Sequence, residues 1–518
     1  MLRFVLILAI LRKGSTSHQP WPTLFGPFSG TSMSIVKGPT AGVLQSHFLN
    51  SSISWSSRYS LTGSPLLLSN FPKSSVILIA QRIIDSIYSL LSIDDNTGEL
   101  IFETPLVVTD SSPGPYSNSC GISSAILDNC GHRAFIALAC GPEPLSLNNY
   151  IFAIDLGTGS IAWNVSSFGT GSFATLASSS LCESLYTTFG SRDSPLYGVR
   201  LSAENGTSIE TFSASFSNFN GLEAQSAFFT VSSTETTGID VLVLANEPSH
   251  PFTALYRIVS TAQVYPKALL VNMSIGSGGI TDYHNYRFIP QLLITDSIGA
   301  SVIASFDPEW NTRDDFLLWR YSQSINTKLL EWQSNITPSS FNATISSIGY
   351  SLTTNTLILC VEYFQEYSEI FFINALTGTL APTTCIFKDE TSPTSSTILR
   401  SLVIDDTPNE GPTLAVLEIK FINKINENGK YYTGQQNITE IFLTTIRLDL
   451  SSPSCLILTR LSLLNSLDIT SSILAPTDFP NTSGLLPHFW PLIAIGPKEG
   501  EYTILIHACC VLKVTSEQ

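Results

Sequence analysis

The sequence contains few charged residues, and this scarcity limits the classes of protein to which the chain can belong. Only 13% of its 518 residues are charged, whereas 43% are hydrophobic. A chain of this composition can bury a large core, which excludes intrinsic disorder. The 41 acidic residues outnumber the 25 basic ones, and the formal net charge is −16. Because no cluster of Lys and Arg is present to neutralise phosphates, we expect no nucleic-acid partner.

Long hydrophobic runs are also missing. The apolar run at residues 4–11 is too short to cross a bilayer, and no later run reaches the roughly 18 residues of a spanning helix, so we expect no membrane span in the mature chain. The early run predicts a signal peptide over residues 1–17, since residues 15–17 offer a small-residue cleavage site. This hypothesis places the mature chain in the secretory lumen or outside the cell. Arg12 and Lys13 interrupt the pattern, so a cytosolic start is the alternative.

Glycosylation sequons are present, but their number is not evidence. The eight Asn-x-Ser/Thr motifs begin at Asn50, Asn164, Asn205, Asn272, Asn335, Asn342, Asn437 and Asn481. Ser, Thr and Asn are so common in this chain that chance predicts about seven such motifs. The count of sequons therefore does not decide whether the protein is glycosylated.

Nine cysteines are too few for a disulfide-based scaffold, yet one pair stands out. Two apolar segments joined by a turn at residues 128–131 predict a hairpin, and its register places Cys120 opposite Cys140. The two could form a disulfide at the open end of the hairpin, with buried free thiols as the alternative. A zinc site that also uses Cys130 and His132 is disfavoured, because the hairpin places these two a strand length away.

One pattern recurs along the chain: an apolar strand, a turn that carries Asp and Thr-Gly or a relative, and a second strand. The clearest copies span residues 88–102, 150–163, 197–212 and 370–380. Their turns contain Asp94, Gly98, Asp155, Gly159, Asn205, Gly206 and Gly378. Glycine supplies the positive φ that the turn needs, and an Asp side chain can accept backbone N–H bonds within the turn. We therefore expect these seven residues to have structural roles.

Each copy follows two further apolar strands, and a unit of four antiparallel strands is a blade of a β-propeller. The leading strands begin near residues 64, 123, 172, 226, 290, 347, 401 and 471, which predicts eight blades; seven are the alternative, because several copies are degenerate. The last unit holds three strands, near 471–475, 492–495 and 502–514, and residues 53–59 are expected to supply the fourth. This strand would close the ring and remove exposed edges. The predicted fold class is all-β, with one closed propeller over residues 18–518.

The repeated turn, together with the opening Trp21-Pro22 and Phe25-Gly26, resembles the quinoprotein-type β-propellers, which include the pyrroloquinoline quinone repeat proteins. In the enzymes of that family a quinone and Ca²⁺ lie on the propeller axis, held by carboxylate and amide ligands, and an Asp acts as base. No set of residues here matches those ligands, so we assign no catalytic or metal-binding residue. Cys509 and Cys510 are similar to the vicinal disulfide of such enzymes, but they fall in a predicted strand, and two buried thiols explain them better.

Two segments are longer than their strands require, Thr109–Asn118 and Phe421–Asn437. Long loops on a rigid scaffold are common sites of recognition, although solvated insertions are the alternative. We therefore expect a non-catalytic propeller that binds a protein or peptide in a secretory compartment. The first alternative is a dehydrogenase of alcohols or sugars that uses pyrroloquinoline quinone with Ca²⁺, and the second is a protein that binds glycans or small ligands. Trp163 and Trp332 are expected to pack between blades.

Overall fold

A computed structural model gives the fold of the chain. It describes residues 33–34, 38–39, 44–48, 59–61, 66–68, 75–82, 87–108, 120–128, 130–140, 148–170, 175–178, 182–191, 194–214, 223–231, 239–246, 252–259, 263–272, 294–295, 300–306, 316–322, 330–336, 343–363, 367–388, 395–405, 412–425, 431–447, 455–463, 494–498, 500–506 and 510–516. The regular elements in these ranges are all β-strands. The same ranges contain no helix that is long and apolar enough to cross a membrane.

The described strands form eight small sheets, numbered here along the chain. Sheet 1 contains β3 (Tyr59–Leu61), β4 (Leu66–Leu68), β5 (Ser75–Arg82), β6 (Tyr88–Asp94) and β7 (Leu100–Pro105). Sheet 2 contains β8 (Cys120–Leu127), β9 (Arg133–Cys140), β10 (Asn148–Asp155) and β11 (Ile161–Thr170). Sheet 3 contains β12 (Thr175–Ser178), β13 (Ser184–Ser191), β14 (Ser194–Ser202) and β15 (Ser208–Ala214). Sheet 4 contains β16 (Glu223–Val231), β17 (Ile239–Asn246), β18 (Phe252–Val259) and β19 (Gln263–Asn272).

The second half of the chain continues the series. Sheet 5 contains β20 (Ile294–Thr295), β21 (Ala300–Phe306), β22 (Phe316–Ser322) and β23 (Leu330–Ile336). Sheet 6 contains β24 (Ala343–Ser351), β25 (Thr356–Tyr363), β26 (Tyr367–Asn374) and β27 (Leu380–Phe387). Sheet 7 contains β28 (Ser395–Asp405), β29 (Thr413–Ile425), β30 (Tyr431–Arg447) and β31 (Leu456–Ser462), joined by β1 (Met33–Ser34). Sheet 8 contains β32 (Ala494–Lys498), β33 (Glu501–Ile506) and β34 (Cys510–Ser516), joined by β2 (Leu44–Phe48).

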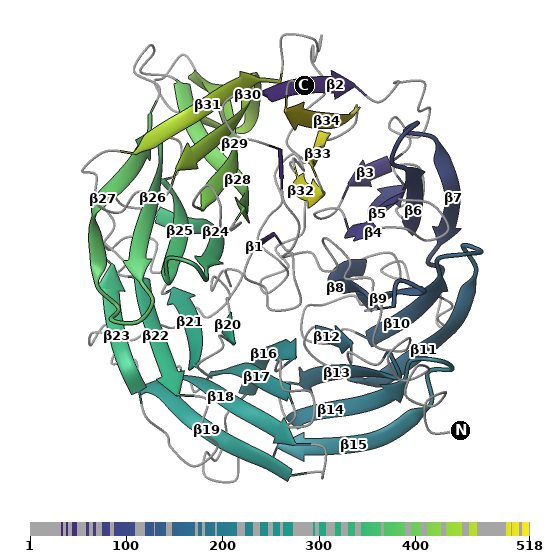
Figure 1. Ribbon diagram of the computed structural model, residues 1–518. Coiled ribbons are helices and arrows are strands. Elements are labelled where there is room, and N and C mark those ends of the chain that lie inside the picture. Colours follow the sequence, from purple (N-terminus) through teal and green to yellow (C-terminus); the bar gives the residue numbers. More distant parts are fainter. Residues whose placement is uncertain are drawn as a thin grey trace, which may run out of the picture.

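The sheets are arranged in a ring, with the first strand of each sheet on the inside and the last on the outside (Figure 1). Inner strands of neighbouring sheets are in contact, for example β4 with β8, β8 with β12 and β24 with β28. The ring closes where β32 of sheet 8 contacts β4 of sheet 1. A ring of small antiparallel sheets is the architecture of a β-propeller, as the repeated pattern predicts.

The hydrophobic core is divided into layers between neighbouring sheets. One layer includes Ile77 and Leu90 of sheet 1 with Ile136 and Phe152 of sheet 2. Similar layers lie between sheets 2 and 3, 5 and 6, and 6 and 7. Because a middle strand has a neighbouring sheet on each face, its residues are buried on both faces, as in all seven residues of β6. The long apolar runs of the sequence follow from this two-sided burial.

The N-terminal segment joins the last two sheets. β1 pairs in parallel with β28 and forms the inner edge of sheet 7, and β2 pairs with β34 as the outermost strand of sheet 8. The segment predicted for this second position was residues 53–59. Of these, 53–58 lie outside the described residues, and Tyr59 begins β3, which pairs with β5 of sheet 1. The closing strand in the structure is thus an earlier part of the chain, because β3 extends sheet 1.

Sheet 8 also differs from the sequence prediction in its strand boundaries. The segment 502–514, expected as one strand, is divided between β33 and β34, which pair with each other. The segment near 492–495, expected as the middle strand, contributes to β32 on the inside. Gly500, with a φ of 73°, lies in the turn that reverses the chain between β32 and β33. The leading strand predicted near residue 471 lies outside the described residues.

Candidate functional site

The connections between strands lie on two faces of the ring. Since neighbouring strands are antiparallel, the turns between the first and second strands and between the third and fourth strands of a sheet share one face. We call this the turn face; it carries the repeated turns at 94–99, 155–160, 202–207 and 374–379. The connections between the second and third strands, and those between sheets, lie on the opposite face, the loop face. The turn face and the loop face are described in turn below.

On the turn face, each repeated turn is held by hydrogen bonds to one side chain. Oδ1 of Asp94 accepts bonds from the backbone N–H of Asn96 and Thr97 at 2.8 and 3.0 Å. Oδ1 of Asp155 accepts one from the N–H of Thr158 at 2.8 Å. Gly98 and Gly159 follow with φ values of 72° and 71°. These carboxylates therefore stabilise the turns, which is a structural role.

The other two clear copies differ at these positions. Asn374 takes the place of the aspartate in one, whereas in the other Ser202 stands at the aspartate position and Asn205 at the position of Thr97 and Thr158, directly before the glycine. Oδ1 of Asn205 accepts hydrogen bonds from Thr207, and Gly206 has a φ of 72°. Oδ1 of Asn374 accepts bonds from the N–H of Leu376 and Thr377. Asn374 was not among the turn residues singled out in the sequence. Its position before Thr377-Gly378 was the signal that could have found it, because Asn and Asp make the same turn.

An aromatic side chain from the preceding sheet packs on the glycine of three of these turns. Trp163 of sheet 2 lies on Gly206, and its Nε1 donates to the carbonyl oxygen of Ala203 at 3.0 Å. Trp332 of sheet 5 lies on Gly378, and its Nε1 donates to the carbonyl oxygen of Ala375 at 2.8 Å. Each turn is thereby locked to its neighbour. The prediction that both tryptophans pack between blades agrees with these contacts.

Phe102 of sheet 1 makes the same contact with Gly159 of sheet 2. A Cβ atom on Gly159 would lie 2.6 Å from the Phe102 ring. The hydroxyl of Thr104 also donates a hydrogen bond to the carbonyl oxygen of Gly159. These three turns are thus bonded internally and packed against the neighbouring sheet.

Three disulfides are present among the described residues. Cys120 and Cys140 pair across β8 and β9, with a Cα–Cα distance of 4.0 Å. Cys130 and Cys182 join turns of sheets 2 and 3, with Cα atoms 6.2 Å apart. The third disulfide, Cys385–Cys455, joins sheets 6 and 7. Sequence reasoning found only the first pair, because the other two connect residues of different sheets.

Another described cysteine, Cys360, is not in a disulfide. Cys360 of β25 is buried in the layer between sheets 6 and 7. Its burial raises the pKa of the thiol to about 12, since the thiolate would lose its hydration. The thiol therefore behaves as a small apolar side chain.

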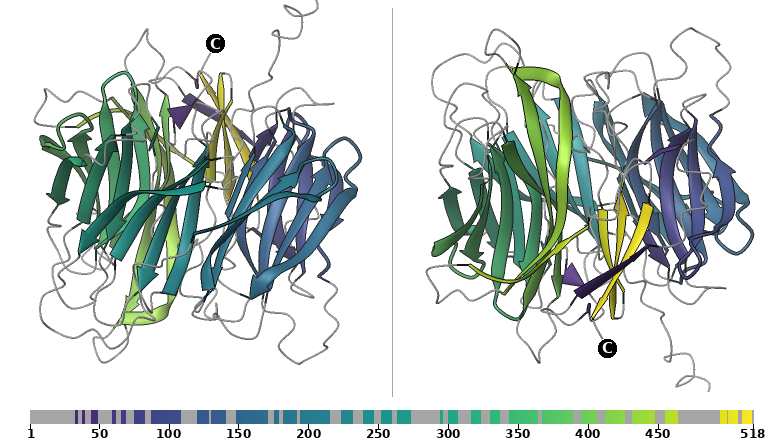
Figure 2. Two further views of the ribbon diagram at one scale, coloured as in Figure 1. Left: turned by 90° about the horizontal axis from the view of Figure 1, so that it is seen from below. Right: turned by 90° about the horizontal axis from the view of Figure 1, so that it is seen from above.

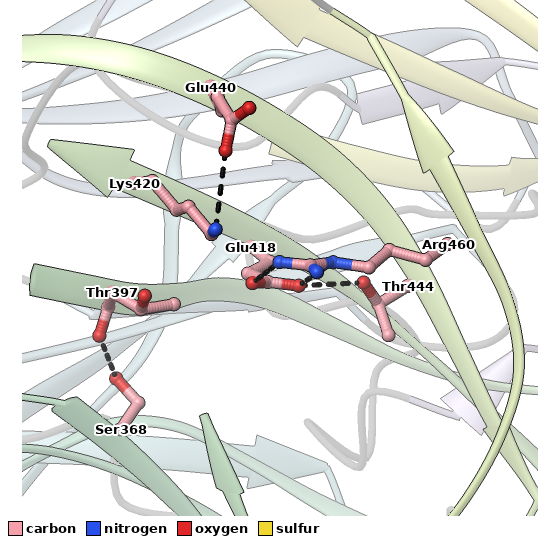
Figure 3. Close-up of polar contacts among 7 residues, drawn as sticks. All are labelled: Ser368, Thr397, Glu418, Lys420, Glu440, Thr444 and Arg460. Carbon is pink, nitrogen blue, oxygen red and sulfur yellow. Dashed lines mark hydrogen bonds and ion pairs between the residues drawn. The ribbon is translucent and has the colours of Figure 1, made fainter. Parts of the chain in front are cut away.

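A buried ion pair lies within sheet 7 (Figure 3). Glu418 of β29 is buried, and Arg460 of β31 donates hydrogen bonds from Nε and Nη2 to its two carboxylate oxygens, the first at 2.9 Å. The hydroxyl of Thr444 on β30 donates to the same carboxylate at 3.1 Å. The guanidinium of Arg460 also stacks over the ring of Phe442 at 4.1 Å. Three adjacent strands are thus joined by one carboxylate.

Further polar contacts surround this pair. Lys420 forms an ion pair with Glu440 at 3.2 Å (Figure 3). Ser368 of sheet 6 donates to the carbonyl oxygen of Thr397 at 3.1 Å and accepts from the N–H of Leu399. These bonds connect sheet 6 to sheet 7. The arrangement stabilises the part of the β29–β30 hairpin that lies within sheet 7. The carboxylates of Glu418 and Glu440 are both paired with cations.

The β29–β30 hairpin extends beyond its neighbours. Its ladder runs from Thr413 and Arg447 to Ile425 and Tyr431. β28 pairs with β29 only as far as Ile422, so the hairpin continues past it at the loop face (Figure 2). Within the segment Phe421–Asn437 that stood out in the sequence, residues 421–425 and 431–437 form the strands of this projecting end.

The second long segment is attached to the same face. Thr109–Asn118 lies outside the described residues, but β7 ends at Pro105 and β8 begins at Cys120, and both ends belong to the loop face. The strand ends that flank Thr109–Asn118 and the projecting end of the hairpin thus belong to the same face.

Two contacts close the ring around sheet 8. Lys513 of β34 lies 3.4 Å from the buried carboxylate of Asp95 in sheet 1. On the other side, the N–H of Gly38 donates to Oδ2 of Asp405 at 3.0 Å, and Gly38 lies against the ring of Tyr502. Burial, and secondarily the charge of Asp405, raise the pKa of Tyr502. The N-terminal segment therefore fills the junction between sheets 7 and 8.

Within the described part of the chain, no group of three or more His, Cys, Asp and Glu side chains could hold a metal ion. No protein-family model and no curated protein sequence matches the chain.

Solved structures with a similar arrangement are known. BamB from Moraxella catarrhalis aligns with 92% of this chain and 100% of its own, at 11% identity and a TM-score of 0.41. The Dos1 propeller aligns over 96% of this chain and 95% of its own, at 9% identity and a TM-score of 0.42. Quinohemoprotein alcohol dehydrogenase from Comamonas testosteroni aligns over 78% of each chain, at 12% identity and a TM-score of 0.37.

Proposed function

We propose that this protein is a non-catalytic scaffold that binds a protein or peptide on the loop face of a closed, eight-bladed propeller in an oxidising compartment. The observation that carries the proposal is the placement of the two long segments. Thr109–Asn118 and Phe421–Asn437 are far apart in the sequence, yet the strands that they connect end on the same face. Long connections on one face of a rigid ring are the usual setting of a recognition surface.

The difference between the two faces supports this proposal. The repeated turns are bonded internally and packed on aromatic side chains, as Gly206 is on Trp163. The loop face carries the projecting hairpin, whose base is braced by the buried pair of Glu418 and Arg460. A braced hairpin loses little conformational entropy when it binds, which favours affinity.

The engaged acids support a binding role over a catalytic one. Asp94 and Asp155 accept hydrogen bonds inside their turns, and Glu418 receives Arg460 and Thr444. A general base needs a carboxylate that is within reach of a substrate. Each of these three carboxylates serves the fold instead.

The three disulfides support the oxidising compartment. Two of them, Cys130–Cys182 and Cys385–Cys455, join neighbouring sheets. Disulfides of this kind persist in secreted and lumenal proteins and are rare in the cytosol. The signal peptide predicted at residues 1–17 agrees with this compartment.

Site-specific photo-crosslinking tests the binding face. A photoreactive amino acid is placed at Val107 and Lys388 on the loop face, and at Leu352 and Leu376 on the turn face, in the full-length protein produced in its own cells. All four residues are exposed. Leu376 is the matched control for Val107, since each is an apolar side chain that is about half exposed, at 46% and 50%. We expect both loop-face positions to give the same discrete adduct with another polypeptide.

The turn-face positions should give no such adduct. Equal labelling from both faces would refute a loop-face interface. The same adduct from the turn face alone would place the interface on the wrong side of the ring.

A further inference from the structure

Two of the eight sequons become informative once their places in the fold are known. Asn164 lies on β11, the outermost strand of sheet 2, and both Asn164 and Ser166 are exposed. Asn205 and Thr207 are exposed in the turn between β14 and β15. The number of sequons is uninformative, because it equals the chance expectation. Exposure is informative, because a folded protein must leave room for an attached glycan.

The side chains at the first site follow the alternation of the strand. Trp163 is buried against sheet 3, and successive residues of a strand point to opposite faces of the sheet. Asn164 and Ser166 therefore share the face opposite to Trp163. No strand among the described residues pairs with the outer side of β11, so this edge of sheet 2 is accessible.

The second site is held in a defined conformation. Oδ1 of Asn205 accepts hydrogen bonds from Oγ1 of Thr207 at 2.7 Å and from its backbone N–H at 3.0 Å. The asparagine and the hydroxyl residue of the sequon are therefore in direct contact. These bonds use the carboxamide oxygen, whereas a glycan is attached through Nδ2. A glycan on Asn205 is thus compatible with the turn.

We propose that the protein carries N-linked glycans at Asn164 and Asn205. The proposal rests on the proposed function only for the compartment, since the glycan donor is found in the secretory pathway. In the reaction, Nδ2 forms a bond to the anomeric carbon of an oligosaccharide carried on a lipid pyrophosphate. The bond between that carbon and the phosphate oxygen breaks, the amide loses a proton, and the lipid pyrophosphate leaves.

The positions of the two glycans deepen the proposed function. Asn205 lies on the turn face, and Asn164 lies three residues after Ile161, the turn-face end of β11. Both sites therefore lie towards the turn face of sheets 2 and 3, to which the turns joined by the Cys130–Cys182 disulfide also belong. Glycans there obstruct the turn face of this sector and leave the loop face accessible to a partner.

Glycopeptide mapping tests the proposal on the full-length protein purified from its own cells. The protein is digested without reduction, and glycans are released enzymatically in heavy-oxygen water. The enzyme converts each glycosylated asparagine to an aspartate that carries the heavy label. Spontaneous deamidation at Asn205-Gly206 before this step leaves no label. A parallel digest in heavy-oxygen water without the enzyme measures the deamidation that occurs during the step, and only label in excess of it counts as a glycan. We expect the label at both Asn164 and Asn205.

Variants assign each glycan to its site. N164Q and T207A should each remove one glycan, seen as a single step in electrophoretic mobility. T207S is the matched control, because it keeps the hydroxyl group of the sequon and should retain the glycan.

The same digest separates the two proposals. If the disulfide-linked peptide of Cys130 and Cys182 is recovered while both asparagines are unlabelled, the glycan proposal is wrong and the compartment stands. If the cysteines are reduced and the asparagines unlabelled, both proposals fail. A label at one site alone overturns the assignment of the other.

Discussion

The contact between Trp332 and Gly378 gives a prediction whose size follows from the structure. Gly378 has a φ of 72°, and a Cβ atom there would lie 2.6 Å from the indole ring. An alanine in this left-handed conformation costs about 1–2 kcal/mol. Forcing the buried indole to move adds about 1–3 kcal/mol. We therefore expect G378A to lower the free energy of unfolding by about 2–5 kcal/mol.

A second glycine isolates the backbone part of this cost. Gly500 has a φ of 73°, and a Cβ atom there would have no neighbour within 4 Å. G500A should therefore cost only the conformational part, about 1–2 kcal/mol. In a W332A background, which removes the obstructing ring, G378A should cost no more than G500A does.

Urea unfolding followed by far-ultraviolet circular dichroism measures these differences. This signal does not depend on the tryptophan that W332A removes. The reasoning is refuted if G378A and G500A shift the midpoint equally, or if the cost of G378A is unchanged by W332A.

Three further predictions concern the cysteines and the ion pair. Cys360 should resist alkylation at mildly alkaline pH in the folded protein and react after unfolding, because burial raises its pKa to about 12; modification of the native protein, detected by mass spectrometry, would contradict this. C130S/C182S should lose about 4 kcal/mol of stability, since the 52-residue separation sets the loop-closure entropy, and an unchanged urea midpoint would show that the disulfide adds nothing. R460M should lower the free energy of unfolding by about 3 kcal/mol, because it leaves the carboxylate of Glu418 unpaired and that side chain is only 4% exposed. E418Q should lower it by only about 1 kcal/mol, because the Arg460 side chain is 40% exposed and can be hydrated. Equal urea midpoints for the two variants would refute this.

The repeated turns could be predicted from the sequence because the residues that determine them are close together in the chain. Asp94 and Asp155 bond to N–H groups two or three residues away, and the following glycine takes a positive φ. The register that places Cys120 opposite Cys140 could be predicted for the same reason, since both residues belong to one hairpin. Asn374 shows the limit of this reasoning. A pattern defined by aspartate does not include it, although its side chain accepts the same hydrogen bonds within the turn.

The sequence by itself determined the all-β class, the small four-stranded units and the conformation of their turns. These features depend on residues close together in the chain, where alternation and turn chemistry act directly. The tertiary structure alone decided which strand completes the last sheet, since β2 pairs with β34 at the opposite end of the chain and no local pattern in the sequence singled β2 out. It alone decided the Cys130–Cys182 and Cys385–Cys455 pairs and the partners of Glu418. These contacts join residues 26 to 70 positions apart. The two disulfides depend on the packing of one sheet on the next, and the Glu418 contacts depend on the pairing of three strands within sheet 7.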